Sequence, residues 1–377
     1  MGRLGRKCGH CQSSLRVCTN TDTPGRRNSS LCSSADEFRS PNRSIRVGGP
    51  TLRAADQEQD VPAQADFIEQ AAPFRAELIA HCYRMLGSVH DAEDLVQETY
   101  VRAWRGYEGF EERAALRTWL YRIATTACLR ALQNQARRVL PAGIGDASVD
   151  PETPLEGGGS HDWLEPIPDA LTFRNPESAA AARQSIRLAV MTALQELPAR
   201  QRAVLILRDV VQFSAAEVAE LLETTPAAVN SSLQRARARL AEVAPREEDL
   251  SEPDDAERRE LIDRYCAAFE NADMAALTEL LQADVKLQMP PVPVWFRGRD
   301  VVLRFLIARA LAKAGDIVMI PTAANGQPAV AEYRRSADDV KRAHSIHVLT
   351  KGGTGIAAIT VFLDPSLFTS FGLAASV

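Results

Sequence analysis

Two closely spaced helix-start signals constrain this chain more than any other feature. Ser214-Ala-Ala-Glu217 fits a capping box, in which a serine hydroxyl and a glutamate carboxylate satisfy free N–H groups at a helix start. A few residues later Thr225 fits an N-cap and Pro226 a first helical position. The sequence therefore predicts two short helices joined by a tight turn.

The second of these helices divides into an apolar and a polar face. At about 100° per residue, Val229, Leu233 and Ala236 share one face, which predicts packing against the first helix. The opposite face and its margin carry short hydrogen-bonding side chains and arginines, namely Asn230, Ser231, Gln234, Arg235 and Arg237. Such residues suit base edges and phosphates, so we predict a DNA-reading helix-turn-helix. The alternative is a solvated helix whose basic end is favoured by the helix dipole.

The hydrophobic pattern changes along the 377 residues and divides the chain. Residues 66–138 and 184–243 repeat apolar side chains at helical spacing, which predicts two all-α units. Residues 258–377 begin with two helical stretches and then alternate, which predicts an α+β domain. Residues 139–183 and 244–257 predict flexible acidic linkers, and residues 1–62 a disordered basic extension. The predicted strands are Val285–Met289, Ile317–Ile320, Ala329–Tyr333, His344–Leu349 and Ile356–Leu363.

The formal net charge of −5 conceals a strong segregation of charge. Residues 88–112 carry seven acids against two Arg, and Asp91 is the predicted N-cap of a helix there. Residues 113–138 carry six Arg and no acid, together with Trp119 and Tyr121. An acidic surface beside a basic one predicts two partners, a protein with a basic docking surface and nucleic acid. For Trp119 itself, core packing is the favoured role.

Several classes of protein are disfavoured. No run approaches the roughly 18 to 20 apolar residues of a membrane-spanning helix, so we predict a cytoplasmic protein with no membrane partner. The scattered cysteines indicate reduced thiols. Cys8 and Cys11, with three further Cys or His residues nearby, leave a zinc site open as an alternative, but their spacing fits no standard knuckle. We predict neither a metal nor a cofactor.

Four motifs in a fixed order carry a resemblance to a known family. They are DAEDLVQETYVRAW from Asp91 to Trp104, LRTWLYRIA from Leu116 to Ala124, LPARQRAV from Leu197 to Val204, and QRARARL from Gln234 to Leu240. They resemble regions 2 and 4 of bacterial RNA polymerase sigma-70 family factors of the extracytoplasmic function (ECF) group. The downstream α+β domain resembles the SnoaL-like appendage of the SigG-like and SigJ-like members.

The resemblance implies a sigma factor that binds core RNA polymerase and directs promoter recognition and transcription initiation. It assigns polymerase docking to Asp91, Glu93, Asp94 and Glu98. It assigns the downstream promoter element to Arg117, Trp119, Arg122 and Thr126, and the upstream element to Asn230, Ser231, Gln234, Arg235 and Arg237. Thr126 stands where relatives often carry Asn, and Arg130 where they often carry Asp, so the downstream sequence preference is left open.

The α+β domain is the part for which the resemblance leaves function open. A SnoaL-like fold is a helix-backed curved sheet that forms a cone, and enzymes also use it. Catalysis would need a buried acid or His aimed into the cone. The candidates are Asp263, Tyr265, Asp284, His344 and His347, but a structural role is favoured for each and no catalytic residue is predicted.

We expect this domain instead to tune the sigma factor. Trp295-Phe-Arg-Gly298 predicts an apolar lip that takes a small ligand or an intramolecular contact, with residues 247–260 and 364–372 at that contact. Two alternatives belong to other classes: a one-component, ligand-responsive DNA-binding regulator, and a SnoaL-like enzyme fused to a DNA-binding domain.

Overall fold

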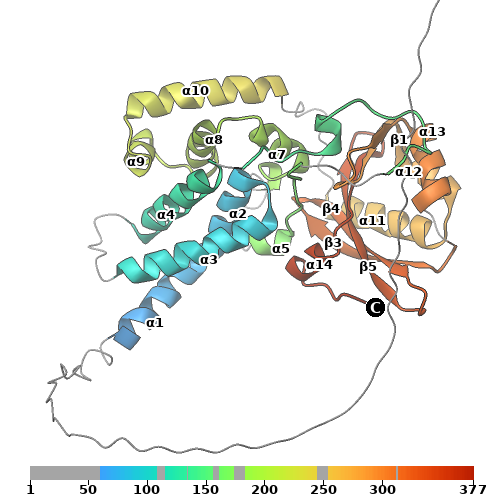
Figure 1. The fold of residues 1–377 in the computed structure, drawn as a ribbon, viewed down its shortest axis with the longest axis horizontal. Coiled ribbons are helices and arrows are strands. Elements are labelled where there is room, and N and C mark those ends of the chain that lie inside the picture. Colours follow the sequence, from blue (N-terminus) through green and yellow to red (C-terminus); the bar gives the residue numbers. More distant parts are fainter. Residues whose placement is uncertain are drawn as a thin grey trace, which may run out of the picture. The chain divides into compact units, whose positions relative to one another are not determined.

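In the computed structural model of the chain, helices come first and a sheet follows, in the order that the hydrophobic pattern predicts (Figure 1). The structure describes residues 60–107, 115–133, 135–155, 161–173, 183–243, 254–310 and 313–377. These residues all belong to one compact unit, Ala54–Val377. The cysteine cluster at Cys8 and Cys11 and nearly all of the predicted basic extension lie outside the described residues.

The first helical group contains α1 (Asp60–Ala71), the 3-10 turn η1 (Ala72–Phe74), α2 (Arg75–Leu86), α3 (Val89–Gly106) and α4 (Leu116–Ala131). Gly87 ends α2 with a φ of 75°, a conformation that glycine adopts at low cost. Ser88 then caps α3 by accepting a hydrogen bond from the backbone N–H of Asp91 at 3.1 Å. The prediction of Asp91 as the N-cap is therefore wrong, because the helix begins at Val89 with Ser88 as its N-cap, and Asp91 lies inside the first turn.

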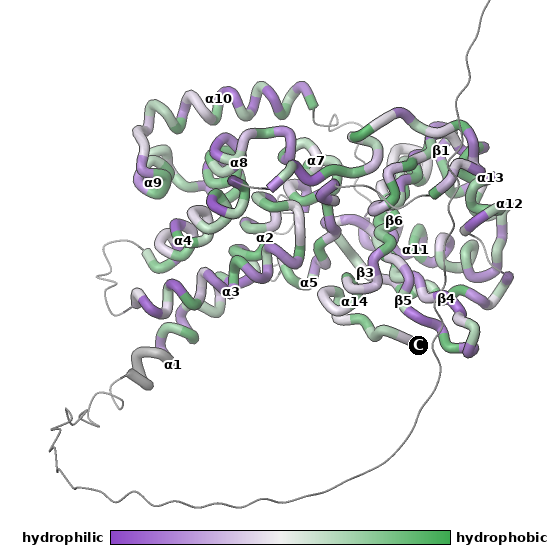
Figure 2. Tube along the Cα trace, in the orientation of Figure 1, coloured by the Kyte–Doolittle hydropathy of each residue, from purple (hydrophilic) through white to green (hydrophobic). Residues whose placement is uncertain are grey.

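The second helical group confirms the predicted helix-turn-helix. It contains α7 (Leu188–Gln195), α8 (Ala199–Leu205), the π-helical turn η5 (Ile206–Val210), α9 (Ala215–Leu221) and α10 (Pro226–Val243). Both bonds of the capping box form, since Ser214 N donates to Glu217 Oε2 at 2.7 Å and Glu217 N donates to Ser214 Oγ at 3.2 Å. Hydrophilic and hydrophobic residues alternate along α10 (Figure 2), and its buried residues are Val229, Leu233 and Ala236.

The C-terminal domain combines helices with a six-stranded sheet, so the predicted α+β fold is confirmed. Its elements are α11 (Asp255–Glu270), α12 (Met274–Leu280), β1 (Leu281–Gln288), β2 (Trp295–Arg297), α13 (Arg299–Phe305), η7 (Leu306–Ala310), β3 (Ile317–Ala324), β4 (Gln327–Arg335), β5 (Lys341–Lys351), β6 (Ile356–Phe362) and α14 (Leu367–Ser370). The strand order is β2-β1-β6-β5-β4-β3, and every neighbouring pair is antiparallel except β1 and β6. Each predicted strand run lies mainly in a strand, whereas β2 was not predicted because its residues were assigned to the apolar lip.

This sheet is buried on both faces. Along β4, Val330 belongs to a core inside the C-terminal domain, whereas Ala331 and Tyr333 belong to the core that the two helical groups share. On β6, Val361 belongs to the first core and Phe362 to the second. Since successive side chains of a strand point to opposite faces, one face lines the cone and the other packs against the helical part. The C-terminal domain is therefore joined to the helices by a continuous hydrophobic core.

The linker that follows α4 is packed where the structure describes it. It contains the 3-10 turn η3 (Pro141–Gly143) and the short helix α5 (Asp169–Thr172). Leu140, Leu164 and Ile167 are buried in the shared core. The described segments thus differ from the predicted flexible tether, because these apolar residues, interspersed among the acids, find a surface to pack on.

The turn between β3 and β4 joins the parts of the chain. Asn325 and Gly326 have φ values of 56° and 66°, as a two-residue hairpin turn requires. The fully buried amide of Asn325 accepts from Ile167 N at 3.1 Å and donates to Tyr83 Oη and to the carbonyl oxygen of Ile186, both at 2.7 Å. One side chain therefore contacts α2, the linker and the segment before α7.

Neighbouring residues extend this contact. Gly326 N donates to Asp169 Oδ1 at 2.8 Å, and Leu188 N donates to Gln327 Oε1 at 3.0 Å. The backbone N–H of Asn325 donates to the carbonyl oxygen of Ile167 at 2.9 Å. We call residues 324–327 with these bonds the Asn325 turn.

Replacing Asn325 by Ala should lower the free energy of unfolding by at least about 3 kcal/mol. It leaves the buried Ile167 N–H and Ile186 carbonyl without this partner and removes one hydrogen bond of the Tyr83 hydroxyl, which still donates to the carbonyl oxygen of Glu165. Asp339→Ala is the matched control, since Asp339 also has a positive φ but lies exposed in the next turn. We expect the control to cost about 1 kcal/mol. Urea denaturation measures both, and equal losses would contradict the role assigned to the amide.

Candidate functional sites

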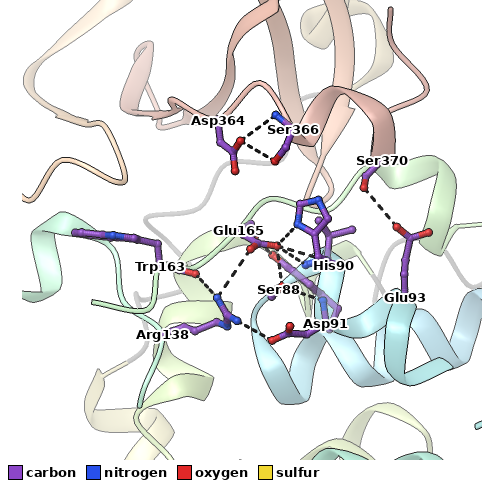
Figure 3. Close-up of polar contacts among 12 residues, drawn as sticks. Ser88, His90, Asp91, Glu93, Arg138, Trp163, Glu165, Asp364, Ser366 and Ser370 are labelled. Atoms are coloured by element: carbon purple, nitrogen blue, oxygen red, sulfur yellow. Dashed lines mark hydrogen bonds and ion pairs between the residues drawn. The ribbon is translucent and has the colours of Figure 1, made fainter. Parts of the chain in front are cut away.

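The start of α3, where the predicted docking acids lie, is held by a carboxylate from the linker (Figure 3). Glu165 Oε2 accepts from Ser88 Oγ at 2.8 Å and from Val89 N at 3.0 Å, and lies 3.0 Å from His90 Nδ1. A carboxylate at this position satisfies free N–H groups and complements the positive end of the helix dipole. The linker thus stabilises the first turn of α3.

The four predicted docking acids are not equally accessible. Arg138 Nη2 donates to Asp91 Oδ2 at 2.6 Å, and its Nη1 donates to the carbonyl oxygen of Trp163 at 2.9 Å (Figure 3). Glu93 Oε2 lies 3.4 Å from Ser370 Oγ, a group from α14 in the C-terminal domain. Two of the acids are therefore in contact with other parts of the chain.

The remaining two docking acids face outward. Asp94 is exposed, and Glu98 forms an ion pair with Arg102, one turn further along α3. This pair is partly exposed on both sides, so it offers little resistance to a competing partner. Asp94 and Glu98 form the accessible part of the α3 acidic surface.

Arg117 on α4 is held in place by an ion pair and by two aromatic rings. Its Nε and Nη2 atoms donate to the carboxylate of Glu77 at 2.8 to 3.1 Å, and the guanidinium lies about 5 Å from the ring centroids of Tyr121 and Phe213. A bidentate ion pair over aromatic rings holds an arginine in one orientation. Arg117 therefore connects α2, α4 and the segment before α9 in this conformation.

The other predicted downstream-element residues differ in exposure. Arg122 and Thr126 are exposed on α4, and Thr126 Oγ1 donates to the carbonyl oxygen of Arg122 at 2.7 Å. Trp119 is partly buried against the shared core, in agreement with the packing role favoured for it. Arg122 also lies 3.5 Å from Glu223, which stands in the turn of the helix-turn-helix.

The predicted upstream-element residues lie together on the exposed face of α10. Asn230, Ser231, Gln234, Arg235 and Arg237 are all exposed. Arg235 Nη1 donates to Ser231 Oγ at 2.7 Å, and Arg237 forms a two-point ion pair with Asp209 at 2.6 and 2.9 Å. Side chains of this kind in this position can reach base edges and phosphates in a major groove.

In the C-terminal domain, three of the five candidate residues meet around an acid that the sequence analysis missed. Tyr265 Oη lies 2.9 Å from His347 Nδ1, and His347 Nε2 lies 3.0 Å from Glu332 Oε2. Ser345 Oγ donates to the same carboxylate oxygen at 2.6 Å, and His344 Nδ1 lies 3.2 Å from it. Tyr265, His347 and Glu332 are almost fully buried, so the group forms an enclosed polar chain.

The Glu332 carboxylate is held in its charged form. Burial alone would raise its pKa, but hydrogen bonds from His344 and His347 outweigh burial and keep the pKa well below its usual range. The sequence signal for Glu332 is a single acid inside the apolar run Ala329–Tyr333, which predicts only a strand. Asp263 and Asp284 lie apart from this group, exposed to solvent.

The described residues contain no group of three or more His, Cys, Asp or Glu side chains arranged to hold a metal ion. No helix among them is both long enough and apolar enough to cross a membrane.

Comparisons with known proteins agree with this architecture. A Sigma-70 region 2 model matches residues 72–138, a Sigma-70, region 4 model residues 187–240, and a SnoaL-like domain model residues 262–362. The ECF RNA polymerase sigma factor SigG of Mycobacterium tuberculosis (strain ATCC 25618 / H37Rv) is 47% identical over 313 residues, which cover 82% of this chain and 84% of SigG. The chain therefore belongs to the ECF family of RNA polymerase sigma factors.

More distant relatives support the same assignment. The sigma factor SigJ of M. tuberculosis (strain ATCC 25618 / H37Rv) is 30% identical over 248 residues, which cover 64% of this chain and 72% of SigJ. A crystal structure of M. tuberculosis SigJ matches the fold with a TM-score of 0.53 at 23% identity, and the match covers 81% of this chain and all of that one. The two sigma regions followed by a SnoaL-like domain are thus a shared architecture.

A buried histidine beneath α4 makes the stability of this sigma factor depend on pH. Burial lowers the pKa of His81 to about 3, whereas the unfolded chain has a pKa of about 6.5. Below about pH 6.5 the histidine binds a proton in the unfolded state but stays neutral in the folded state, so the free energy of unfolding falls as the pH falls. We expect His81 alone to remove about 1.4 kcal/mol between about pH 7.5 and about pH 5.5.

Urea denaturation of the native protein and of His81→Gln at both pH values isolates this contribution. The comparison is needed because burial raises the pKa of Asp169 to about 6, which acts in the opposite direction. The variant should lose less stability on acidification than the native protein. An identical pH dependence in the two proteins would show that His81 is not the group responsible.

Proposed function

We propose that this sigma factor docks on core RNA polymerase through the acids of α3 and contacts promoter DNA through α4 and the polar face of α10. We further propose that, in the conformation described above, its C-terminal domain restrains both polymerase docking and promoter contact. The observation that carries the proposal is the contact of Glu93 with Ser370 of α14. Together with the ion pair between Asp91 and Arg138, this contact leaves only part of the acidic surface accessible.

The contacts of the helical groups support a closed conformation. The ion pair between Arg122 and Glu223 lies between the helix assigned to the downstream element and the turn of the helix-turn-helix. Promoter elements that are separated along DNA need these two readers apart. Since the ion pair is exposed, it adds little stability, and the main restraint comes from the buried Asn325 turn.

The accessible docking acids can be tested by a charge reversal. Asp94→Lys should weaken binding to core RNA polymerase by at least about tenfold, because it places a cation on the surface that meets a basic partner. Glu279→Lys makes the same charge change on exposed α12 and should leave binding unchanged. Fluorescence anisotropy of labelled protein titrated with polymerase measures both affinities. If Asp94→Lys binds as tightly as the control, the docking assignment fails.

The restraint can be tested by undocking the Asn325 turn. A Cβ atom at Gly326 would lie 2.8 Å from Arg183 Cβ and 3.0 Å from the Arg183 carbonyl oxygen, so Gly326→Ala must shift the backbone on one side. Gly315→Ala is the control, because Gly315 also has a positive φ but has open space around its Cβ position. Both variants place an alanine at a positive φ and so share that backbone strain. Only Gly326→Ala also displaces the Asn325 turn from its partners.

If the C-terminal domain restrains the sigma factor, Gly326→Ala should bind core polymerase at least about fivefold more tightly than Gly315→Ala. Promoter-dependent transcription by the reconstituted holoenzyme should likewise be higher with Gly326→Ala than with Gly315→Ala. Circular dichroism and gel filtration verify that both variants are folded. Equal affinity and equal transcript yield for the two variants would contradict the proposed restraint.

A further inference from the structure

The C-terminal domain contains a cavity of about 170 Å³ on the inner face of the sheet. Most of its wall is apolar, with Phe269, Leu287, Met289, Phe305, Ile359 and Val361 among the lining residues. An apolar cavity of about 150 Å³ is large enough to hold benzene. This cavity therefore has room for a single ring or a short aliphatic chain.

One part of the wall is polar and carries positive charge. Glu332 lines the cavity, but its Oε1 accepts from Arg334 Nε at 2.6 Å and its Oε2 is used by the bonds from Ser345 and the two histidines. The carboxylate is thus fully engaged within the protein. Arg309 and Arg334 also line the cavity, so its polar side presents N–H donors and more positive than negative charge.

The cavity is covered by the linker between the two sigma regions. Leu155 lines it together with residues of the C-terminal domain. Arg309 Nη2 donates to the carbonyl oxygen of Glu152 at 2.6 Å. Further along, Trp295 Nε1 donates to the carbonyl oxygen of Gly145, and Ser148 N donates to the carbonyl oxygen of Trp295, both at 2.8 Å. Residues 145–155, which we call the cover segment, are therefore attached to the C-terminal domain at Gly145, Ser148 and Glu152, and reach the cavity at Leu155.

We propose that this cavity binds a small apolar molecule that carries one hydrogen-bond-accepting oxygen group, a carbonyl or a carboxylate, and that the cover segment closes over it. The apolar wall packs against the body of the molecule, and the N–H groups of the polar side donate hydrogen bonds to its oxygen. A cationic ligand would meet Arg309 and Arg334 and be repelled. This binding site goes beyond the proposed restraint and does not depend on it.

Three single-ring probes distinguish the ligand chemistry in the full-length protein. They are para-fluorobenzoate, para-fluoroacetophenone and para-fluorobenzylamine, which present a carboxylate, a carbonyl and an ammonium group on the same ring. Ligand-observed fluorine NMR should detect binding of at least one oxygen-bearing probe, at least about tenfold tighter than the amine. Binding by only one of the two oxygen probes also supports the site and identifies the charge it prefers. Absence of binding by both, or preferential binding of the amine, would overturn the proposal.

Two substitutions locate the binding. Leu363 lines the cavity and is only partly buried, so Leu363→Trp should fill the cavity with little disturbance of the core. Ile307→Trp places the same ring on an exposed position next to the lining residue Leu306. We expect Leu363→Trp to weaken probe binding at least about tenfold and Ile307→Trp to leave it unchanged. Equal binding by the two variants would place the probe elsewhere and overturn the proposal.

The cover segment has its own readout. Amide hydrogen exchange in residues 145–155 should slow when an oxygen-bearing probe that binds the cavity is added, because Leu155 then gains a packing partner. Leu363→Trp should remove that effect of the probe. If a probe binds in the cavity while exchange in residues 145–155 stays the same, the cover role is wrong.

Discussion

The buried amide of Asn325 is the interaction on which the arrangement of this sigma factor depends. It completes hydrogen bonds of α2, of the linker and of the segment before α7, none of which is its neighbour in the sequence. Buried donors and acceptors are costly when unpaired, so these partners and the turn stabilise one another. The bonds to Asp169 and Leu188 extend the same contact. The C-terminal domain is in this way part of the fold of the helical regions.

The sheet carries this relation further because both of its faces are buried. One face belongs to the core of the helical groups, and the opposite face lines the cavity. Neighbouring residues of one strand, such as Ala331 and Glu332, therefore face the sigma regions and the polar chain in the cavity respectively. Because closely packed strands transmit small displacements, a shift of the side chains around the cavity also shifts the side chains that contact the helices.

Local sequence patterns predicted the helices and strands of this fold well, but they did not predict the contacts between residues far apart in the sequence. The capping box at Ser214, the N-cap at Thr225 and the alternating strand runs are local signals, and each lies where it was expected. The Asn325–Gly326 pair between two strand runs was an available hairpin signal, but nothing local indicates that its amide would be buried against α2. Glu332 was missed for the same reason, because its histidine and serine partners come from β5 and only His347 links it onward to Tyr265 on α11. The linker composition suggested a solvated tether, whereas its scattered apolar residues pack on surfaces formed by distant parts of the chain.

The attachment of the linker at Asn325 also limits how far the two sigma regions can separate. Ile167 and Ile186 both bond to this one side chain, although roughly twenty residues lie between them. A fully extended chain of that length would span about 65 Å. Loss of this attachment would therefore remove one restraint that keeps these two points together, so the reach of region 4 depends in part on a single hairpin turn.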